Sequence, residues 1–215
     1  MTNFHPDAHY LVEYAAGTLS IGPSICVAAH IEHCDECRQQ VHGLNSYGAA
    51  MIEDLEPANI SAGLFEKVLA NLDTEQKTAP QVLPYCREIP KAISKLVPNG
   101  FEDLPWKKYG KDLETCRLSV GEDKYEVSLI RMQAGGTINE HTHKGLEMTV
   151  VLKGVLSDKY GVYKAGDFSA CNADDQHQPM ATQDMECICL TAVEAPVRFK
   201  GWRRVMNPFL SFQPA

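Results

Sequence analysis

Two histidines and a glutamate in the second half of the chain form its clearest metal-binding pattern. His141 and His143 are one residue apart, so both side chains lie on the same face of a β-strand. Glu147 follows four residues later, and Gly135 and Gly154 bracket the group. Imidazole nitrogens and a carboxylate that converge from short strands are ligands for divalent metals. The spacing therefore predicts a metal site built on strands.

A third histidine is available downstream of this group. His177 lies ten residues beyond Asp167, which together with Gly166 opens a further predicted strand. The ligand types suit Zn²⁺ without redox chemistry as well as Fe²⁺ with open positions for oxygen. The alternative interpretation is a pair of exposed strand histidines beside an unrelated glutamate.

A second set of metal-ligand residues lies in the N-terminal part. His30, Cys34 and Cys37 form H-x3-C-x2-C, and steps of four and three residues place them on one face of a helix or helix end. Two thiolates and an imidazole favour Zn²⁺ in a closed four-ligand site. His5 and His9 could each supply the fourth ligand. Weaker competitors for that role are Cys26 and His33. The alternative is an amphipathic helix whose cysteines and histidine pack or face solvent.

A pair of cysteines alternates on a predicted strand near the C-terminus. Cys187 and Cys189 form C-x-C, so both thiols point to the same face. Two such thiols could be oxidised or could approach the metal pocket. The simpler interpretation is that both are buried in one core.

Helices are predicted in the first third of the chain, where apolar residues recur at helical spacing. They lie around residues 11–19, 24–34, 36–52 and 61–72. Because Gly22 and Pro23 interrupt the pattern, Ser24 is expected to cap the second helix. The apolar stripe from Leu64 to Leu72 is either the core of this region or a surface for a partner.

Strands are predicted from about Tyr85 onward, in short runs bounded by Gly, Pro, Asn and Asp. The clearest runs are 127–131, 148–152 and 188–191. Several short strands at close spacing predict a small all-β barrel. The segment Asp73–Pro84 is polar, contains prolines and is expected to be a linker.

Composition excludes several classes of function. The 215 residues carry a net charge of -8 and include eight cysteines. This acidity argues against direct nucleic-acid binding. The polar start, Met1–Tyr10, and the lack of an apolar run of about 18 residues predict neither export nor a membrane span. The cysteines then indicate thiols or metal ligands in the reducing cytoplasm, with Cys86 and Cys116 expected as small buried residues.

Both metal-ligand patterns resemble known families. The spacing from Gly135 to Gly154 resembles the first motif of the cupins. An early His followed about 25 residues later by H-x3-C-x2-C resembles the zinc-binding anti-sigma domain, as do the segments 14–19 (YAAGTL) and 34–38 (CDECR). The combination, over essentially the whole chain, resembles the ChrR-type anti-sigma factors.

The resemblance implies a fold and a set of ligands. It implies a small all-α zinc-binding domain at residues 1–75, a linker at 76–84 and an all-β cupin domain, a double-stranded β-helix barrel, at 85–215. The early His would be His5, which becomes the fourth ligand of a zinc ion. The resemblance implies that the cupin ligands are His141, His143, Glu147 and His177. Each chain would hold two Zn²⁺ ions, with another divalent metal as an alternative in the cupin.

The resemblance also implies a function. Members of the family bind an extracytoplasmic-function (group IV) sigma factor, keep it from RNA polymerase, and release it under singlet oxygen or related oxidative stress. On this resemblance the chain is expected to be a regulator rather than an enzyme, and its acidity and lack of a long apolar run predict no direct contact with nucleic acid or membrane.

One departure from the cupin pattern keeps an enzymatic alternative open. Many cupins carry Pro two residues before the Gly of the second motif and Asn four residues after its His, where this chain has Lys164 and Ala181. The alternative is a metal-dependent cupin enzyme, a dioxygenase or a thiol-handling oxidase, with the helices as a dimerisation arm. An enzyme has no need of the H-x3-C-x2-C set. A DNA-binding repressor is disfavoured by the acidity and by the lack of a basic helix.

Overall fold

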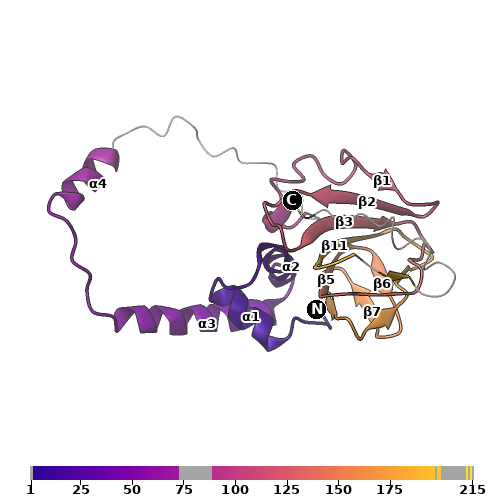
Figure 1. Ribbon diagram of the computed structural model, residues 1–215, viewed down its shortest axis with the longest axis horizontal. Coiled ribbons are helices and arrows are strands. Elements are labelled where there is room, and N and C mark those ends of the chain that lie inside the picture. The colour runs from indigo at the N-terminus through magenta and orange to yellow at the C-terminus, as the bar shows by residue number, and fades with distance from the viewer. Residues whose placement is uncertain (1, 73–88, 197, 200–211, 213, 215) are drawn as a thin grey trace.

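The computed structural model describes residues 2–72, 89–196, 198–199, 212 and 214, and joins N-terminal helices to a barrel of strands (Figure 1). The predicted linker at 76–84 and Cys86 lie outside the described residues. The helices are α1 (Ala8–Ala15), α2 (Ile21–Ile31), α3 (Asp35–Glu53), α4 (Leu64–Leu72) and the short 3-10 helix η1 (Lys91–Ile93). The predicted helical region and the third helix at 36–52 are confirmed.

Helix α2 begins before Ser24, so the predicted cap is wrong. Its N-cap is Ser20, and Gly22 and Pro23 lie in its first turn. Proline is tolerated there because the N–H that it lacks would have no partner within the helix. The carboxylate of Glu122, in the barrel, accepts a hydrogen bond from the Gly22 N–H at 2.9 Å. A backbone N–H at the start of α2, which has no partner within the helix, is therefore hydrogen-bonded to a residue of the barrel.

Three sheets build the barrel, as the strand pattern predicts. The order of the largest is β1-β2-β3-β11-β5-β8, and the two three-stranded sheets are β10-β6-β7 and β12-β4-β9. The strands are β1 (Lys107–Lys108), β2 (Leu113–Leu118), β3 (Glu126–Met132), β4 (His141–Thr142), β5 (Glu147–Lys153), β6 (Val155–Ser157), β7 (Val162–Lys164), β8 (Phe168–Cys171), β9 (Gln176–His177), β10 (Met180–Ala181), β11 (Cys187–Val193) and β12 (Arg198–Phe199).

Strand β11 lies inside the six-stranded sheet and is buried on both faces. Cys189 and Thr191 face the barrel cavity, whereas Ile188, Leu190 and Ala192 join a core cluster that includes residues of α2. Successive side chains of a strand point to opposite faces, which produces this division. Burial on both faces explains why the strand is almost uniformly apolar.

The hydrophobic core runs across the predicted boundary between helices and barrel. Val27 and Cys26 of α2 are fully buried, and α2 packs on β5 and β11. The two elements approach closely at Gly22, where an added Cβ would lie 2.9 Å from the Cβ of Tyr125. Helix α2 therefore shares its core with the barrel.

The other helices bury few residues of their own. In α1 only Leu11 is buried, and in α3 only Cys37 and Val41 are. No residue of α4 is buried, and α3 extends away from the barrel (Figure 1). These helices therefore have little core to hold them together. Over the described residues, none of the helices has the length and apolar character needed to cross a membrane.

Candidate metal centres

Four side chains from three N-terminal segments form a compact group, here called the N-terminal site. It contains His5 from the segment before α1, His30 near the end of α2, Cys34 at the N-cap of α3 and Cys37 in its first turn. Their ligand atoms all lie within 4.8 Å of one another. Nδ1 of His5 is 3.3 Å from Sγ of Cys34 and 3.4 Å from Sγ of Cys37. The H-x3-C-x2-C pattern thus spans the junction of two helices.

The orientation of His30 suits a metal ligand. Its Nδ1 lies 2.7 Å from the carbonyl oxygen of Gly166. Because a carbonyl only accepts, Nδ1 carries the proton and Nε2 presents a lone pair. Nε2 is buried without a hydrogen-bond partner among the described residues. Burial also lowers the pKa of His30, which favours the neutral form that binds metals. A cation held with the two thiols and His5 would satisfy this nitrogen.

The competing residues lie outside this group. His9 is exposed, and its ring lies tilted against the ring of Tyr10 with the centroids 3.8 Å apart. Cys26 is fully buried and points toward the carbonyl of Met148 in β5. His33 is exposed, beside Gly166. The structure therefore brings His5, and none of these three, to the thiols.

The thiol of Cys37 in the N-terminal site is disfavoured from ionising unless a cation is bound beside it. Both thiols of the site are buried, and burial raises the pKa of Cys37 to about 12. A metal must displace the thiol protons, so binding releases protons and strengthens as the pH rises. Two sulfurs and two nitrogens in a closed group are the ligand set of a structural zinc ion.

Three histidines of the barrel form a second group, here called the barrel site. His141 in β4 pairs directly with His177 in β9, and His143 follows β4. Nε2 of His177 lies 3.1 Å from Nε2 of His141 and 3.1 Å from Nε2 of His143. All three side chains are buried. Strand pairing thus unites histidines that are far apart in sequence.

Hydrogen bonds at the other ring nitrogens orient two of these histidines. Nδ1 of His141 donates to the carbonyl of Asn139 at 2.8 Å. Nδ1 of His177 lies 3.0 Å from Oδ2 of Asp158. Both contacts leave Nε2 for a metal, as outer partners of ligating histidines commonly do. Burial works to lower the pKa of His177, but the bond to Asp158 helps raise it to about 10, so a cation competes with a proton there.

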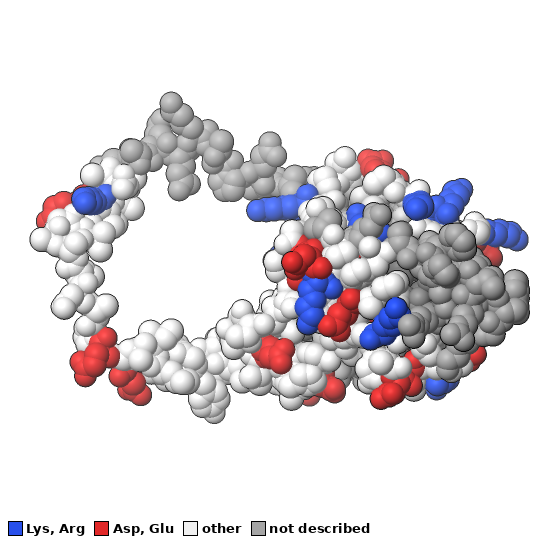
Figure 2. Space-filling model, in the orientation of Figure 1, with Lys and Arg blue, Asp and Glu red and all other residues white. Residues whose placement is uncertain are grey.

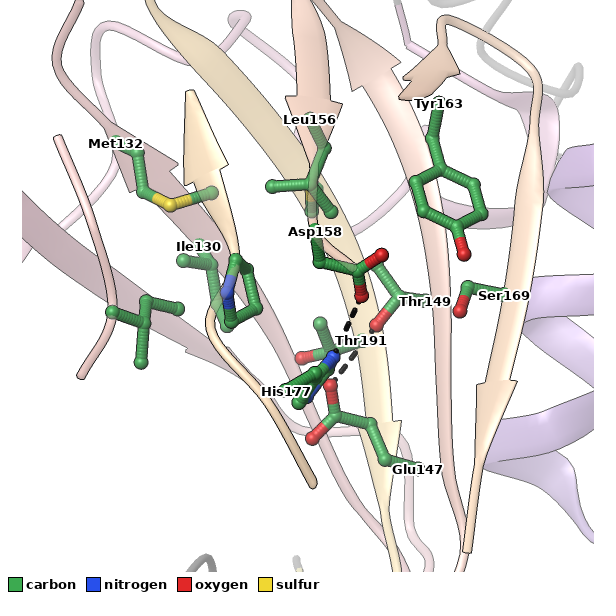
Figure 3. A pocket seen from close by; sticks show the side chains of 13 residues that line it. Ile130, Met132, Glu147, Thr149, Leu156, Asp158, Tyr163, Ser169, His177 and Thr191 are labelled. Atoms are coloured by element: carbon green, nitrogen blue, oxygen red, sulfur yellow. Dashed lines mark hydrogen bonds and ion pairs between the residues drawn. The ribbon is translucent and has the colours of Figure 1, made fainter. Parts of the chain in front are cut away.

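The carboxylate of Glu147 lies beside the three histidines and is directed toward His177 (Figure 3). Its Oε2 is 3.1 Å from Nδ1 of His143, out of line for a hydrogen bond. Its Oε1 accepts a bond from Thr149 at 3.2 Å. The group of converging ligand atoms contains the histidines without Glu147. Glu147 is therefore a neighbour of the three histidines in this structure, 3.1 Å from the ring of His143.

The cavity behind the barrel site is small. Glu147, His177, Asp158 and Tyr163 line it together with apolar side chains (Figure 3), and its volume is about 20 Å³. This is room for about one water molecule, whereas ligand pockets typically enclose roughly 300–1,000 Å³. The cavity therefore has room for a water molecule or a molecule of similar size.

The C-x-C thiols occupy the wall of this barrel, as the simpler interpretation predicts. Cys187 and Cys189 are both buried, and their sulfurs are 3.6 Å apart. Their core cluster includes Met132 and Val151. Cys189 also lines the cavity that contains Glu147. The pair is free of a disulfide, and the hydrogen bond to Cys187, together with burial, raises the pKa of the Cys189 thiol. Cys116 is likewise buried, as predicted.

Several residues that contact the candidate ligands could not be predicted from the spacing patterns. Asp158 is 19 residues from His177, which it orients. Gly166 of the barrel contacts His30 of the N-terminal site through its carbonyl, and Asp167 accepts hydrogen bonds from Asn3 and Phe4, just before His5. No spacing rule links such outer partners to their ligands, because the contact depends on how two distant segments pack.

The chain has close relatives. A family model described as "ChrR Cupin-like domain" matches residues 97–196. A Cereibacter sphaeroides protein named "Anti-sigma-E factor ChrR" is 33% identical over 207 residues, which cover 95% of this chain and 96% of that protein. The crystal structure titled "Rhodobacter sphaeroides SigE in complex with the anti-sigma ChrR" superposes with a TM-score of 0.78 at 31% identity. That match covers 90% of this chain and 99% of the matched one.

Proposed function

The chain belongs to the ChrR family of anti-sigma factors, and on that premise we propose that it binds an extracytoplasmic-function sigma factor and keeps it from RNA polymerase. Singlet oxygen or related oxidative stress releases the partner. The chain acts as a regulator of transcription rather than as an enzyme, in the cytoplasm where polymerase works. Residues 1–75 form the anti-sigma domain, 76–84 the linker and 85–215 the cupin domain.

The observation that carries this proposal is an exposed apolar arm, residues 47–72, from the second half of α3 to the end of α4. Its large apolar side chains that are at least 67% exposed are Tyr47, Met51, Ile52, Leu55, Ile60, Phe65 and Leu72. So many exposed large apolar side chains in one segment are typical of a protein-binding surface. The stripe from Leu64 to Leu72 is therefore not the core of its own domain, and that alternative is wrong.

The surface of the arm fits a partner with both apolar and basic surface. Most of α3 and α4 carries neither acidic nor basic side chains on the face in Figure 2, and acidic ones gather where α3 ends. From Gln39 to Ile52 the sequence contains no Lys, Arg, Asp or Glu. Apolar contacts then supply affinity while the acidic end steers a basic partner. The solved complex of the relative SigE and ChrR supports a sigma factor as that partner.

Both metal centres are proposed to bind zinc. The N-terminal ligands are His5, His30, Cys34 and Cys37, and the ion would join α3, which buries only Cys37 and Val41, to α2 and to the segment before α1. The barrel ligands are His141, His143, Glu147 and His177, for Zn²⁺ or another divalent metal. Zinc supplies folding free energy in the first site and a fixed charge beside the small cavity in the second.

Binding to a sigma factor tests the proposal directly. We expect the zinc-loaded chain to form a 1:1 complex with a group IV sigma factor of its own organism, with a dissociation constant below about 100 nM for an interface of standard size. The complex should fail to start transcription with core polymerase. Size-exclusion chromatography and transcription in vitro measure both effects, with the housekeeping sigma factor as the control. A folded, zinc-loaded chain that binds no group IV sigma factor would refute the proposal.

A second prediction separates repression from response. His141→Ala should lose one equivalent of metal and leave the sigma factor bound, because the barrel site lies outside the arm. Release under singlet oxygen should be blunted, since a signal must act differently on the bound and free states and the emptied barrel can no longer provide that difference. Metal analysis and a sigma-dependent reporter measure these effects.

The exposed neighbour Glu140 provides the control for this prediction. Glu140→Ala should behave as the parent chain in both assays. Full induction in His141→Ala would place the sensor elsewhere, with the thiolates of the N-terminal site as the next candidate.

A further inference from the structure

The β7–β8 turn of the barrel, Lys164–Asp167, touches the N-terminal site. The carbonyl of Gly166 accepts the hydrogen bond from Nδ1 of His30 at 2.7 Å. Gly166 has φ +92°, and an added Cβ would lie 2.7 Å from the Cβ of His33. The turn is therefore pressed against the end of α2, and it orients one of the four candidate zinc ligands.

Asp167 of the same turn holds the segment that carries a second ligand. Its Oδ1 accepts the backbone N–H of Asn3 at 2.6 Å and that of Phe4 at 3.3 Å, and its Oδ2 accepts the N–H of Lys164 at 2.7 Å. The side chain is 1% exposed. Hydrogen bonds to a buried carboxylate are among the strong ones. His5 follows directly after this pinned segment.

The ring of Phe4 fixes the segment to the barrel at a second point. It contacts the ring of Tyr163 with centroids 4.4 Å apart, and a Cβ on Gly161 would lie 2.5 Å from its Cζ. The N–H of Phe168 donates to the carbonyl of Phe4 at 3.1 Å. Tyr163 also lines the cavity of the barrel site, so one ring contact lies between that cavity and the residue that precedes His5.

We infer that the β7–β8 turn is the outer shell of the N-terminal zinc site and that Asp167 is a positioning residue for His5. The two cysteines are placed by the start of α3, whereas both histidines are held by the barrel. The barrel thus sets how firmly the anti-sigma domain retains its metal. This inference rests on the ligand set of the proposed function and adds a route by which the barrel controls it.

Cobalt(II) provides a probe that is specific for this site. A cobalt ion bound to the two thiolates gives a sulfur-to-metal charge-transfer absorption that the His and Glu ligands of the barrel cannot produce. The full chain is loaded with cobalt(II), challenged with excess EDTA, and followed by the decay of this band. Circular dichroism of each variant reports whether the fold is retained.

The variants are Asp167→Asn and Phe4→Ala, with Asp184→Asn as the control. Both carboxylate oxygens of Asp167 accept backbone N–H groups, so the NH2 of an asparagine there would face an N–H donor in either orientation. Phe4→Ala removes the ring that fixes the segment before His5 and leaves the β7–β8 turn unchanged. Asp184 is exposed in the turn after β10. Loss of an outer partner typically costs about 10–100-fold in metal affinity, so the band should decay about 10–100-fold faster in both variants and unchanged in the control.

Each outcome decides the inference. Decay at the parental rate in the folded variants overturns it and leaves the ligand set standing. If Asp167→Asn does not fold, Phe4→Ala alone decides. A parent chain that never shows the band overturns the ligand set itself, and the inference with it.

Discussion

Cys37→Ser should empty the N-terminal site and weaken sigma binding by at least about 100-fold, or about 2.7 kcal/mol. Cys37 is 1% exposed, and α1 and α3 bury little besides it. The metal therefore supplies much of the free energy that holds these helices together, and the arm begins in α3. Metal analysis, thermal unfolding and calorimetric titration with the sigma factor measure the loss.

A pair of histidine variants provides the matched control for this prediction. His5→Ala removes a ligand atom 3.4 Å from Sγ of Cys37 and should reproduce the loss of metal. His9→Ala changes an exposed ring of the same type four residues later and should retain both metal and affinity. Normal zinc content in Cys37→Ser, or equal losses in both histidine variants, would contradict the assignment of the site.

Phe65→Asp combined with Tyr47→Asp should weaken sigma binding strongly without destabilising the chain. The two side chains are 67% and 75% exposed, so a carboxylate at either position stays in water when the chain is free. In the complex it would be buried against an apolar surface. Aromatic hot spots contribute about 2 kcal/mol or more each, so the double variant should lose roughly 1,000-fold in affinity.

Val162→Asp is the control for the arm, because Val162 is 53% exposed on β7 of the barrel. It should leave the dissociation constant within about twofold of the parent, as surface changes outside an interface do. The unfolding temperatures of all variants should agree within a few degrees. If the arm variants bind normally, or if Val162→Asp is equally weak, the partner lies on another surface.

Most helices and strands of this chain can be predicted from the sequence, because each forms mainly according to residues close to it along the chain. The period of α3 and the alternation of β11 depend on residues within a few positions of each other. The types and spacing of His141, His143 and the cysteines likewise indicate metal chemistry before any fold is known. The start of α2 is the exception, since the predicted cap at Ser24 assumed that Pro23 could not lie inside a helix.

Long-range packing decides what the local patterns leave open. Either His5 or His9 could reach the thiols by chain length alone. His5 does so because the barrel holds the residues before it, through contacts with Asp167 that span more than 160 positions.

Whether an apolar stripe is buried or exposed also depends on the tertiary structure. Leu64–Leu72 and the α2 residues around Val27 are both apolar stripes, yet the first is exposed and the second buried. The sequence by itself determines which residues can bind metal and which faces are apolar. Only the tertiary structure decides which ligands lie together and which apolar face remains exposed to a partner. Both depend on how segments that are distant in sequence pack against one another.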